Sequence, residues 1–172
     1  MLAEFNKTIQ QWIAFLDDYS WETLLRKPRP GAWSMGQLYI HLLVSTEFFV
    51  GQAKKAAATD RHHDKSMHED AKRMFAANSF PPMILEGPDN DSNIPQPESK
   101  GEIVLRLNRI KHDIGSFDVA FDETRPAGKT RHPGLLYFSS TEWLQFAEMH
   151  LRHHFLQKKR IDTFLAENPG RE

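Results

Sequence analysis

The sequence contains no cysteine among its 172 residues. This absence excludes disulfide bonds, catalysis by a protein thiolate and zinc sites built on cysteine. Any metal ion must therefore be held by histidine, aspartate, glutamate or backbone oxygen. A reaction that needs a sulfur nucleophile must take it from a second substrate.

An excess of positive charge is also missing. The 22 basic and 23 acidic residues leave a formal net charge of -1, and no arginine-rich stripe is present, which argues against a nucleic-acid partner. No apolar run is long enough to span a bilayer, so no membrane partner is expected. Glu4, Lys7, Gln10 and Gln11 interrupt the N-terminal segment, unlike a signal peptide. We therefore expect a soluble, cytoplasmic protein.

The residues that are abundant point to helices around an aromatic core. The chain has 12 Phe, 4 Trp and 3 Tyr, and its length favours a single domain over residues 1–172. Apolar residues recur every three or four positions in four segments that begin near Leu2, Ser34, Ser99 and Ser139. This period is typical of helices with one buried face. No segment shows the alternation and hairpin turns typical of strands.

Capping signals support this division. Ser34 is followed by Gln37, and Ser139 by Glu142, at the spacing of a capping box at a helix N-terminus. The last helix is predicted to run without a break over residues 139–165. Four such helices pack most simply as an all-α, antiparallel four-helix bundle.

The connection between the second and third helices is long, covering residues 59–98. Within it, Ser66 and Glu69 have capping-box spacing, which predicts a short helix near residues 67–77. Long irregular connections in compact domains tend to be lids or binding loops. We therefore expect a lid, a binding loop or a mobile segment here.

Three of the nine histidines lie on apolar helix faces. His150 and His154 are four residues apart, which places both imidazoles on one face, and His41 occupies an apolar position of the second helix. Each could be a core histidine with its own hydrogen bond. Alternatively, one shared metal ion would satisfy three ring nitrogens at once. Three histidine ligands leave room for water or substrate, as in catalytic rather than structural zinc sites.

Other polar residues lie close to these positions along the helix. His153 flanks the candidate site, either supporting a ligand or facing solvent. Gln157 lies one turn beyond His154 and would orient a ligand imidazole, or would be a partly exposed polar residue. Glu148 lies off the apolar face, and we expect a solvated carboxylate there.

The remaining histidines are expected at the surface. His62, His63 and His68 lie in the polar connection, and His112 lies off the apolar face of the third helix. His132 precedes a proline, which favours extended backbone, and a place at the mouth of the bundle is the alternative for it.

A pattern of residues spread along the chain is shared with a known family: Trp33, Ser34, His41, Glu142, Trp143, His150, His153, His154 and Gln157. In this pattern the chain resembles the DinB-like family of four-helix metal-binding proteins over nearly its whole length. That family includes the YfiT-type metal-dependent hydrolases and the S-transferases that use bacillithiol or mycothiol. The resemblance implies a divalent ion, most often zinc or nickel, on His41, His150 and His154. It also implies a homodimer, and iron and manganese are the remaining candidate ions.

Two functions are compatible with this pattern. The first is a metal-dependent hydrolase or thiol S-transferase, in which the ion lowers the pKa of water or of a low-molecular-weight thiol that then attacks a small-molecule substrate. His153, His132 and Glu142 are the candidate general bases. The second is a non-catalytic metal-binding or stress-response module, in which the long connection contacts a partner. A metal-free bundle with satisfied histidines is the simplest alternative to both.

Overall fold

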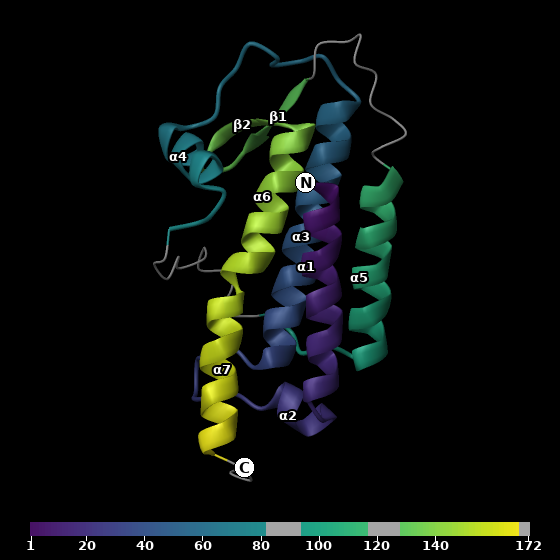
Figure 1. Cartoon of the computed structure of the whole chain (residues 1–172), viewed down its shortest axis with the longest axis vertical. Coiled ribbons are helices and arrows are strands. Elements are labelled where there is room, and N and C mark those ends of the chain that lie inside the picture. The colour runs from purple at the N-terminus through teal and green to yellow at the C-terminus, as the bar shows by residue number, and fades with distance from the viewer. Residues whose placement is uncertain (82–93, 117–127, 169–172) are drawn as a thin grey trace.

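The computed structural model describes residues 1–81, 94–116 and 128–168. Its body is a four-helix bundle, and the predicted all-α fold is confirmed (Figure 1). The long helices are α1 (Leu2–Phe15), α3 (Met35–Ala57), α5 (Lys100–Gly115) and the consecutive pair α6 (Ser140–His153) and α7 (Phe155–Glu167). Shorter elements are the 3-10 turn Leu16–Asp18, α2 (Trp21–Leu25) and α4 (Glu69–Ala77).

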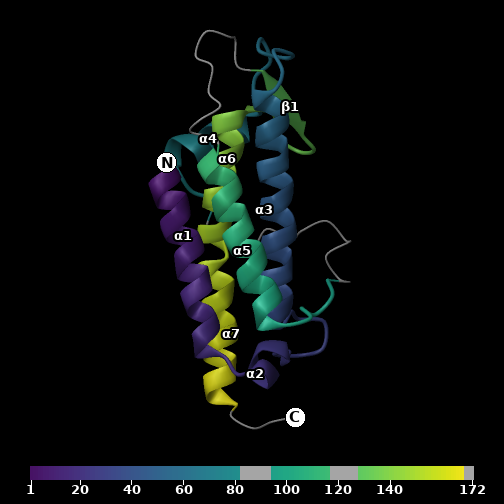
Figure 2. The same ribbon diagram turned by 90° about the vertical axis from the view of Figure 1, so that its right-hand side faces the viewer.

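The helices α3 and α5 run parallel to each other and antiparallel to α1 and α6 (Figures 1 and 2). Lys54, late in α3, pairs with Asp113, late in α5, at 2.9 Å. Trp143, early in α6, instead stacks on Phe49, late in α3, with ring centroids 5.8 Å apart. The predicted antiparallel packing therefore holds between these two pairs of helices, while the members of each pair point the same way.

The parallel pair explains why residues 59–98 are so long a connection. The chain leaves the end of α3 and must return to the end of the bundle where α3 began, as in bundles with crossover connections. At that end, Gln37 Nε2 donates to the carbonyl of Ile94. Gly36 is needed for this approach, because a Cβ there would lie 2.8 Å from Pro97 Cδ.

The predicted caps place most helix ends. Ser34 and Ser139 both form capping boxes, and Ser99 caps α5. The predicted short helix is present as α4, but its N-cap is His68 rather than Ser66, because the His68 Nδ1 accepts from a backbone amide two residues later. The capping box predicted at Ser66 is therefore wrong, although the short helix that was predicted from it is present.

A two-stranded antiparallel hairpin, β1 (Lys129–His132) and β2 (Leu136–Ser139), precedes α6. The prediction that the chain has no strands is wrong at this point. Each strand has only four residues, too few for alternation to stand out. His132 closes the turn, since its Nδ1 accepts from the amides of Gly134 and Leu135 at 3.2 Å each.

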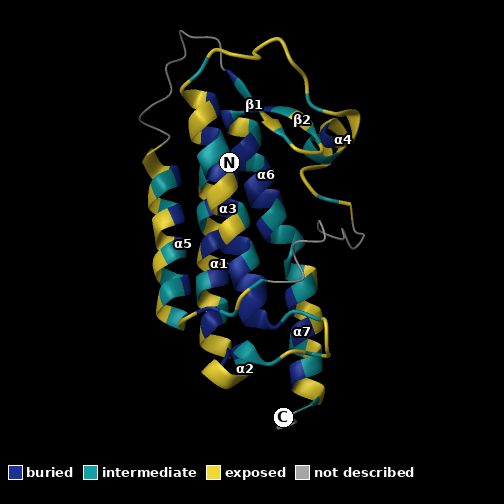
Figure 3. Ribbon diagram, turned by 180° about the vertical axis from the view of Figure 1, so that it is seen from behind, coloured by how far each residue is buried: buried dark blue, intermediate teal, exposed yellow. Residues whose placement is uncertain are grey.

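Aromatic side chains fill the interior, toward which the helices turn their buried faces (Figure 3). Trp12, Tyr39 and Trp143 are fully buried. The Tyr39 hydroxyl donates to the Trp12 carbonyl at 2.7 Å, which ties α1 to α3 inside the core. In the part of the chain that the structure describes, no helix is both long and apolar enough to cross a membrane. Phe117 and Phe121 continue the apolar period of the third helix in the sequence, and they lie outside the described residues.

Candidate metal centre

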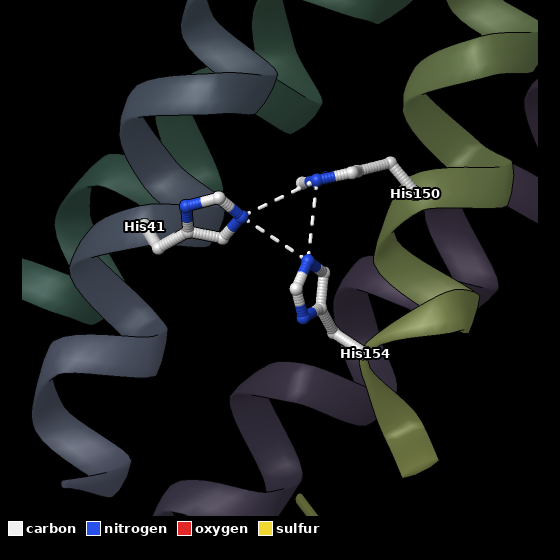
Figure 4. A group of neighbouring side chains, drawn as sticks. All are labelled: His41, His150 and His154. Carbon is white, nitrogen blue, oxygen red and sulfur yellow. Dashed lines mark hydrogen bonds between the residues drawn. The ribbon is translucent and has the colours of Figure 1, made fainter. Parts of the chain in front are cut away.

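Three histidine side chains, from α3, from α6 and from the junction of α6 with α7, point toward one another (Figure 4). The His41 Nε2 lies 3.3 Å from the His150 Nε2 and 3.1 Å from the His154 Nε2, and the last two atoms are 3.2 Å apart. Among residues 1–81, 94–116 and 128–168, this is the group of histidine or acidic side chains close enough to share an ion. These are the three histidines predicted from their places on apolar helix faces.

A break in the fourth helix places His154. The prediction of one continuous helix over residues 139–165 is wrong, because α6 ends at His153 and α7 begins at Phe155. In an unbroken helix the Leu151 carbonyl would accept from the amide of Phe155. Here it accepts from the indole Nε1 of Trp12 at 3.2 Å. A side chain that enters the hydrogen-bond ladder is an established cause of a kink, and this kink lies beside a candidate ligand.

The three Nε2 atoms fit a shared cation. A neutral imidazole has one N–H and one lone pair, so three Nε2 atoms that face one another cannot all be satisfied by hydrogen bonds among themselves. Zinc–nitrogen bonds are about 2.0–2.1 Å long, which separates two tetrahedral ligands by about 3.3–3.4 Å. The separations of 3.1–3.3 Å between the Nε2 atoms of His41, His150 and His154 are close to this value.

Gln157 orients one of the three rings. The His154 Nδ1 donates to the Gln157 Oε1 at 2.9 Å. With the proton on Nδ1, the Nε2 lone pair of a neutral His154 points to the other two histidines, as a metal ligand requires. Of the two alternatives for Gln157, the structure supports the one in which its amide contacts a candidate ligand.

Two of these rings, His150 and His154, are neutral at neutral pH because their pKa values are lowered. Burial, and then the neighbouring His41, lower the pKa of His154 to about 3, although the hydrogen bond that His154 donates to Gln157 acts in the opposite direction. Burial lowers the pKa of His150 well below its ordinary value, and His154 and His41 lower it further. Metal binding needs deprotonated ligand nitrogens, so His150 and His154 are already in the required state.

Aromatic rings surround the group. Trp33 lies against His41, with ring centroids 4.9 Å apart. Phe49 and Phe80 lie 5.4 Å and 6.1 Å from His150. The sequence analysis did not place Phe80 here, because it follows α4 in the long connection, and no local spacing relates it to His150. For Trp33 there was a signal, since it directly precedes the cap of the helix that carries His41.

Glu148 was predicted to be a solvated carboxylate, and this prediction is wrong. Its side chain is buried and joins α1 to α6. The Thr8 hydroxyl donates to it at 2.9 Å, and the Arg152 Nε contacts its two oxygens at 2.7 Å and 2.9 Å. The Glu148 carboxylate faces α1 rather than the three histidines. The helix period showed only the buried face that carries the histidines, so it did not predict a second buried face toward α1.

Of the three candidate bases, His153 is the one beside the group. Glu142 accepts from the Ser139 amide at 2.6 Å as part of the capping box, and His132 closes the hairpin turn. The His153 ring lies 5.4 Å from the His154 ring. Burial, and then the positive charge of Arg160, lower the pKa of His153, which keeps it neutral and able to accept a proton.

The other four histidines lie at the surface, as predicted: His62, His63, His68 and His112. None of them belongs to the three-histidine group. The candidate centre therefore uses the histidines that lie on apolar helix faces.

The fold and the three-histidine group define a helical bundle with a candidate metal site between two of its helices. The chain belongs to the DinB superfamily, whose model matches residues 4–157. The crystal structure of TT2238, a four-helix bundle protein, is similar at a TM-score of 0.58 and 14% identity, covering 92% of this chain and 96% of that one. That likeness concerns the fold alone. No match was found among curated proteins. Family membership and the three-histidine group are together compatible with metal binding.

Proposed function

We propose that this protein is a metal-dependent enzyme that binds a divalent ion through His41, His150 and His154. The observation that carries the proposal is the convergence of three Nε2 atoms within 3.1–3.3 Å of one another. Imidazole nitrogen suits zinc, nickel and iron, and manganese prefers oxygen ligands, so manganese is the weakest candidate. When bound, the ion supplies Lewis acidity that lowers the pKa of a water or thiol ligand.

The protein side chains would hold the ion, and one of them would accept the proton released in the reaction. Gln157 keeps the His154 lone pair directed at the centre, and the aromatic neighbours Trp33 and Phe80 keep bulk water away from the ligand rings. His153 would accept the proton that the nucleophile releases, since its ring is adjacent to that of His154. General bases of this kind act directly or through one water.

The reaction class proposed is transfer of a low-molecular-weight thiol to an electrophilic small molecule, or hydrolysis. Membership of the DinB superfamily supports this choice. Because the chain has no cysteine, the thiol would be a second substrate. Both reactions need a coordination position that the protein does not fill, and three histidine ligands leave one.

Elemental mass spectrometry of untagged protein tests the metal site. We expect close to one zinc, nickel or iron ion per chain in the wild type and in the control His112→Ala, whose side chain is 86% exposed. We expect loss of the ion in His150→Ala and in His41→Gln, with helix content by circular dichroism unchanged. A wild type that stays metal-free after reconstitution with divalent ions would overturn the proposal. An ion that is bound without thiol-transfer or hydrolytic activity would instead identify a non-catalytic metal-binding module.

A further inference from the structure

The face of α3 that carries His41 continues as an exposed apolar surface. Val44 and Phe48 lie three and seven residues after His41, and residues at this spacing share one side of a helix. Val44 is 56% exposed and Phe48 is 45% exposed. Single exposed apolar side chains are ordinary on protein surfaces. Two that are one turn apart, on the side of the helix that carries a candidate metal ligand, offer an apolar surface near the candidate centre.

A third apolar side chain lies near the same group and comes from the connection that follows α4. Phe80 follows α4, and its half-buried ring lies 6.1 Å from the His150 ring and 5.4 Å from the His153 ring. It packs edge-on against Phe146 of α6, with centroids 5.0 Å apart, which holds it in place. The name apolar rim is used here for Phe80, which lies beside His150, together with Val44 and Phe48, which share the side of α3 that carries His41.

The polar contacts of two of the histidine ligands come from uncharged groups. Within the described ranges, the hydrogen bonds of His150 and His154 are made with histidine rings and with Gln157. Arg152 of α6 is paired with Glu148, whose carboxylate also accepts from Thr8 of α1. A ligand at this centre would find a cation, uncharged polar groups and apolar surface, with the positive charge of Arg160 beyond His153.

We infer that the substrate of this centre carries an apolar group, of the size of an aromatic ring, next to the atom that binds the ion, and that the apolar rim receives that group. The inference rests on the proposed metal site. Transfer of apolar surface from water to such a rim is favourable in proportion to the area buried. The rim residues would select substrates, and the ion would bind the reacting end.

Two small hydroxamates serve as probes, because they share one metal-binding head and differ in the attached group. Acetohydroxamate carries a methyl group and benzohydroxamate carries a phenyl group. Their affinities for zinc-loaded protein are measured by calorimetry in the wild type, in Val44→Ser and in Phe80→Ser. The matched control is Leu105→Ser, because Leu105 is 70% exposed on α5, away from the group. Any intrinsic preference of zinc for one hydroxamate is common to all four proteins and cancels in the comparison.

We expect the wild type and Leu105→Ser to bind benzohydroxamate at least about tenfold more tightly than acetohydroxamate, equivalent to about 1.4 kcal/mol. In Val44→Ser and Phe80→Ser, this preference should fall at least about threefold, while the affinity for acetohydroxamate stays unchanged. Equal wild-type affinities, or a preference that both rim variants retain, would overturn the inference. Failure of either hydroxamate to bind zinc-loaded protein would overturn it and leave metal binding intact. If the protein does not load zinc, this result is seen before any hydroxamate is added. It would overturn both the proposed metal site and the inference about the substrate.

Discussion

Replacing Trp12 by phenylalanine tests whether one side chain maintains the break in the fourth helix. The change keeps an aromatic ring but removes the Nε1–H that donates to the Leu151 carbonyl at 3.2 Å. Both residues are fully buried, so water does not easily replace the donor. The carbonyl then either stays without this partner, or takes the amide of Phe155 and straightens the helix, which would move His154.

The two outcomes differ in how much they lower the free energy of unfolding and the affinity for zinc. A buried carbonyl that loses its partner costs about 1–3 kcal/mol, and the smaller ring leaves a cavity that costs about 24 cal/mol per Å³. If the carbonyl stays unpaired, we expect the free energy of unfolding of metal-free protein to fall by about 2–4 kcal/mol, on these two terms. If the helix straightens, the loss of stability is smaller, but zinc affinity falls about 10–100-fold, as for other changes that misplace a ligand.

Urea unfolding of the metal-free protein and zinc competition with a chromophoric chelator measure both quantities. The absorption spectrum of the cobalt-substituted protein adds a readout of ligand geometry that a loss of packing alone would not change. Trp21→Phe is the matched control, since Trp21 is 38% exposed in α2. If Trp12→Phe matches the wild type in unfolding free energy, zinc affinity and cobalt spectrum, the account of the helix break is refuted.

Three further changes test separate contacts. Gln157→Leu removes the acceptor for the His154 Nδ1–H, and zinc affinity by chelator competition should fall about 10–100-fold. Arg152→Leu leaves the buried Glu148 carboxylate without its cationic partner, and the free energy of urea unfolding should fall by about 2–3 kcal/mol. Burial lowers the pKa of His132 to about 4 from 6.5. Since the unfolded chain takes up this proton first, metal-free protein should lose stability as the pH falls from 6.5 to 4, and His132→Asn should flatten that dependence.

Each change has a control at an exposed position. Gln11→Leu should leave zinc affinity unchanged, Arg73→Leu, at a side chain 73% exposed, should leave the unfolding free energy nearly unchanged, and His112→Asn should keep the wild-type pH dependence. Zinc affinity that is equal in Gln157→Leu and wild type would contradict the orienting role of Gln157. A stable Arg152→Leu would show that Glu148 needs no cation, and an unaltered pH profile in His132→Asn would assign the acid sensitivity to other groups.

The local spacing in the sequence was sufficient to predict most helices and the pair of histidines. The period of 3.6 residues identified the buried faces, and the Ser34 and Ser139 capping boxes formed where predicted. The same period predicted that His150 and His154 share a face, and their Nε2 atoms are 3.2 Å apart. These features depend on residues within a few positions of one another, so a helix of known geometry is enough to derive them.

Contacts between segments distant in the sequence decided how the helices are arranged and which residues surround the candidate site. Three features depend on contacts between residues of separate elements. These are the parallel course of α3 and α5, the burial of Glu148 against Thr8, and the approach of Phe80 to His150. Local spacing carries no information about which helices become neighbours or how they face each other. The break at His154 shows the same limit, since residues 139–165 have an uninterrupted helical period. The Trp12 indole, from another helix, supplies the hydrogen bond to the Leu151 carbonyl at that break, and only packing brings the two groups together.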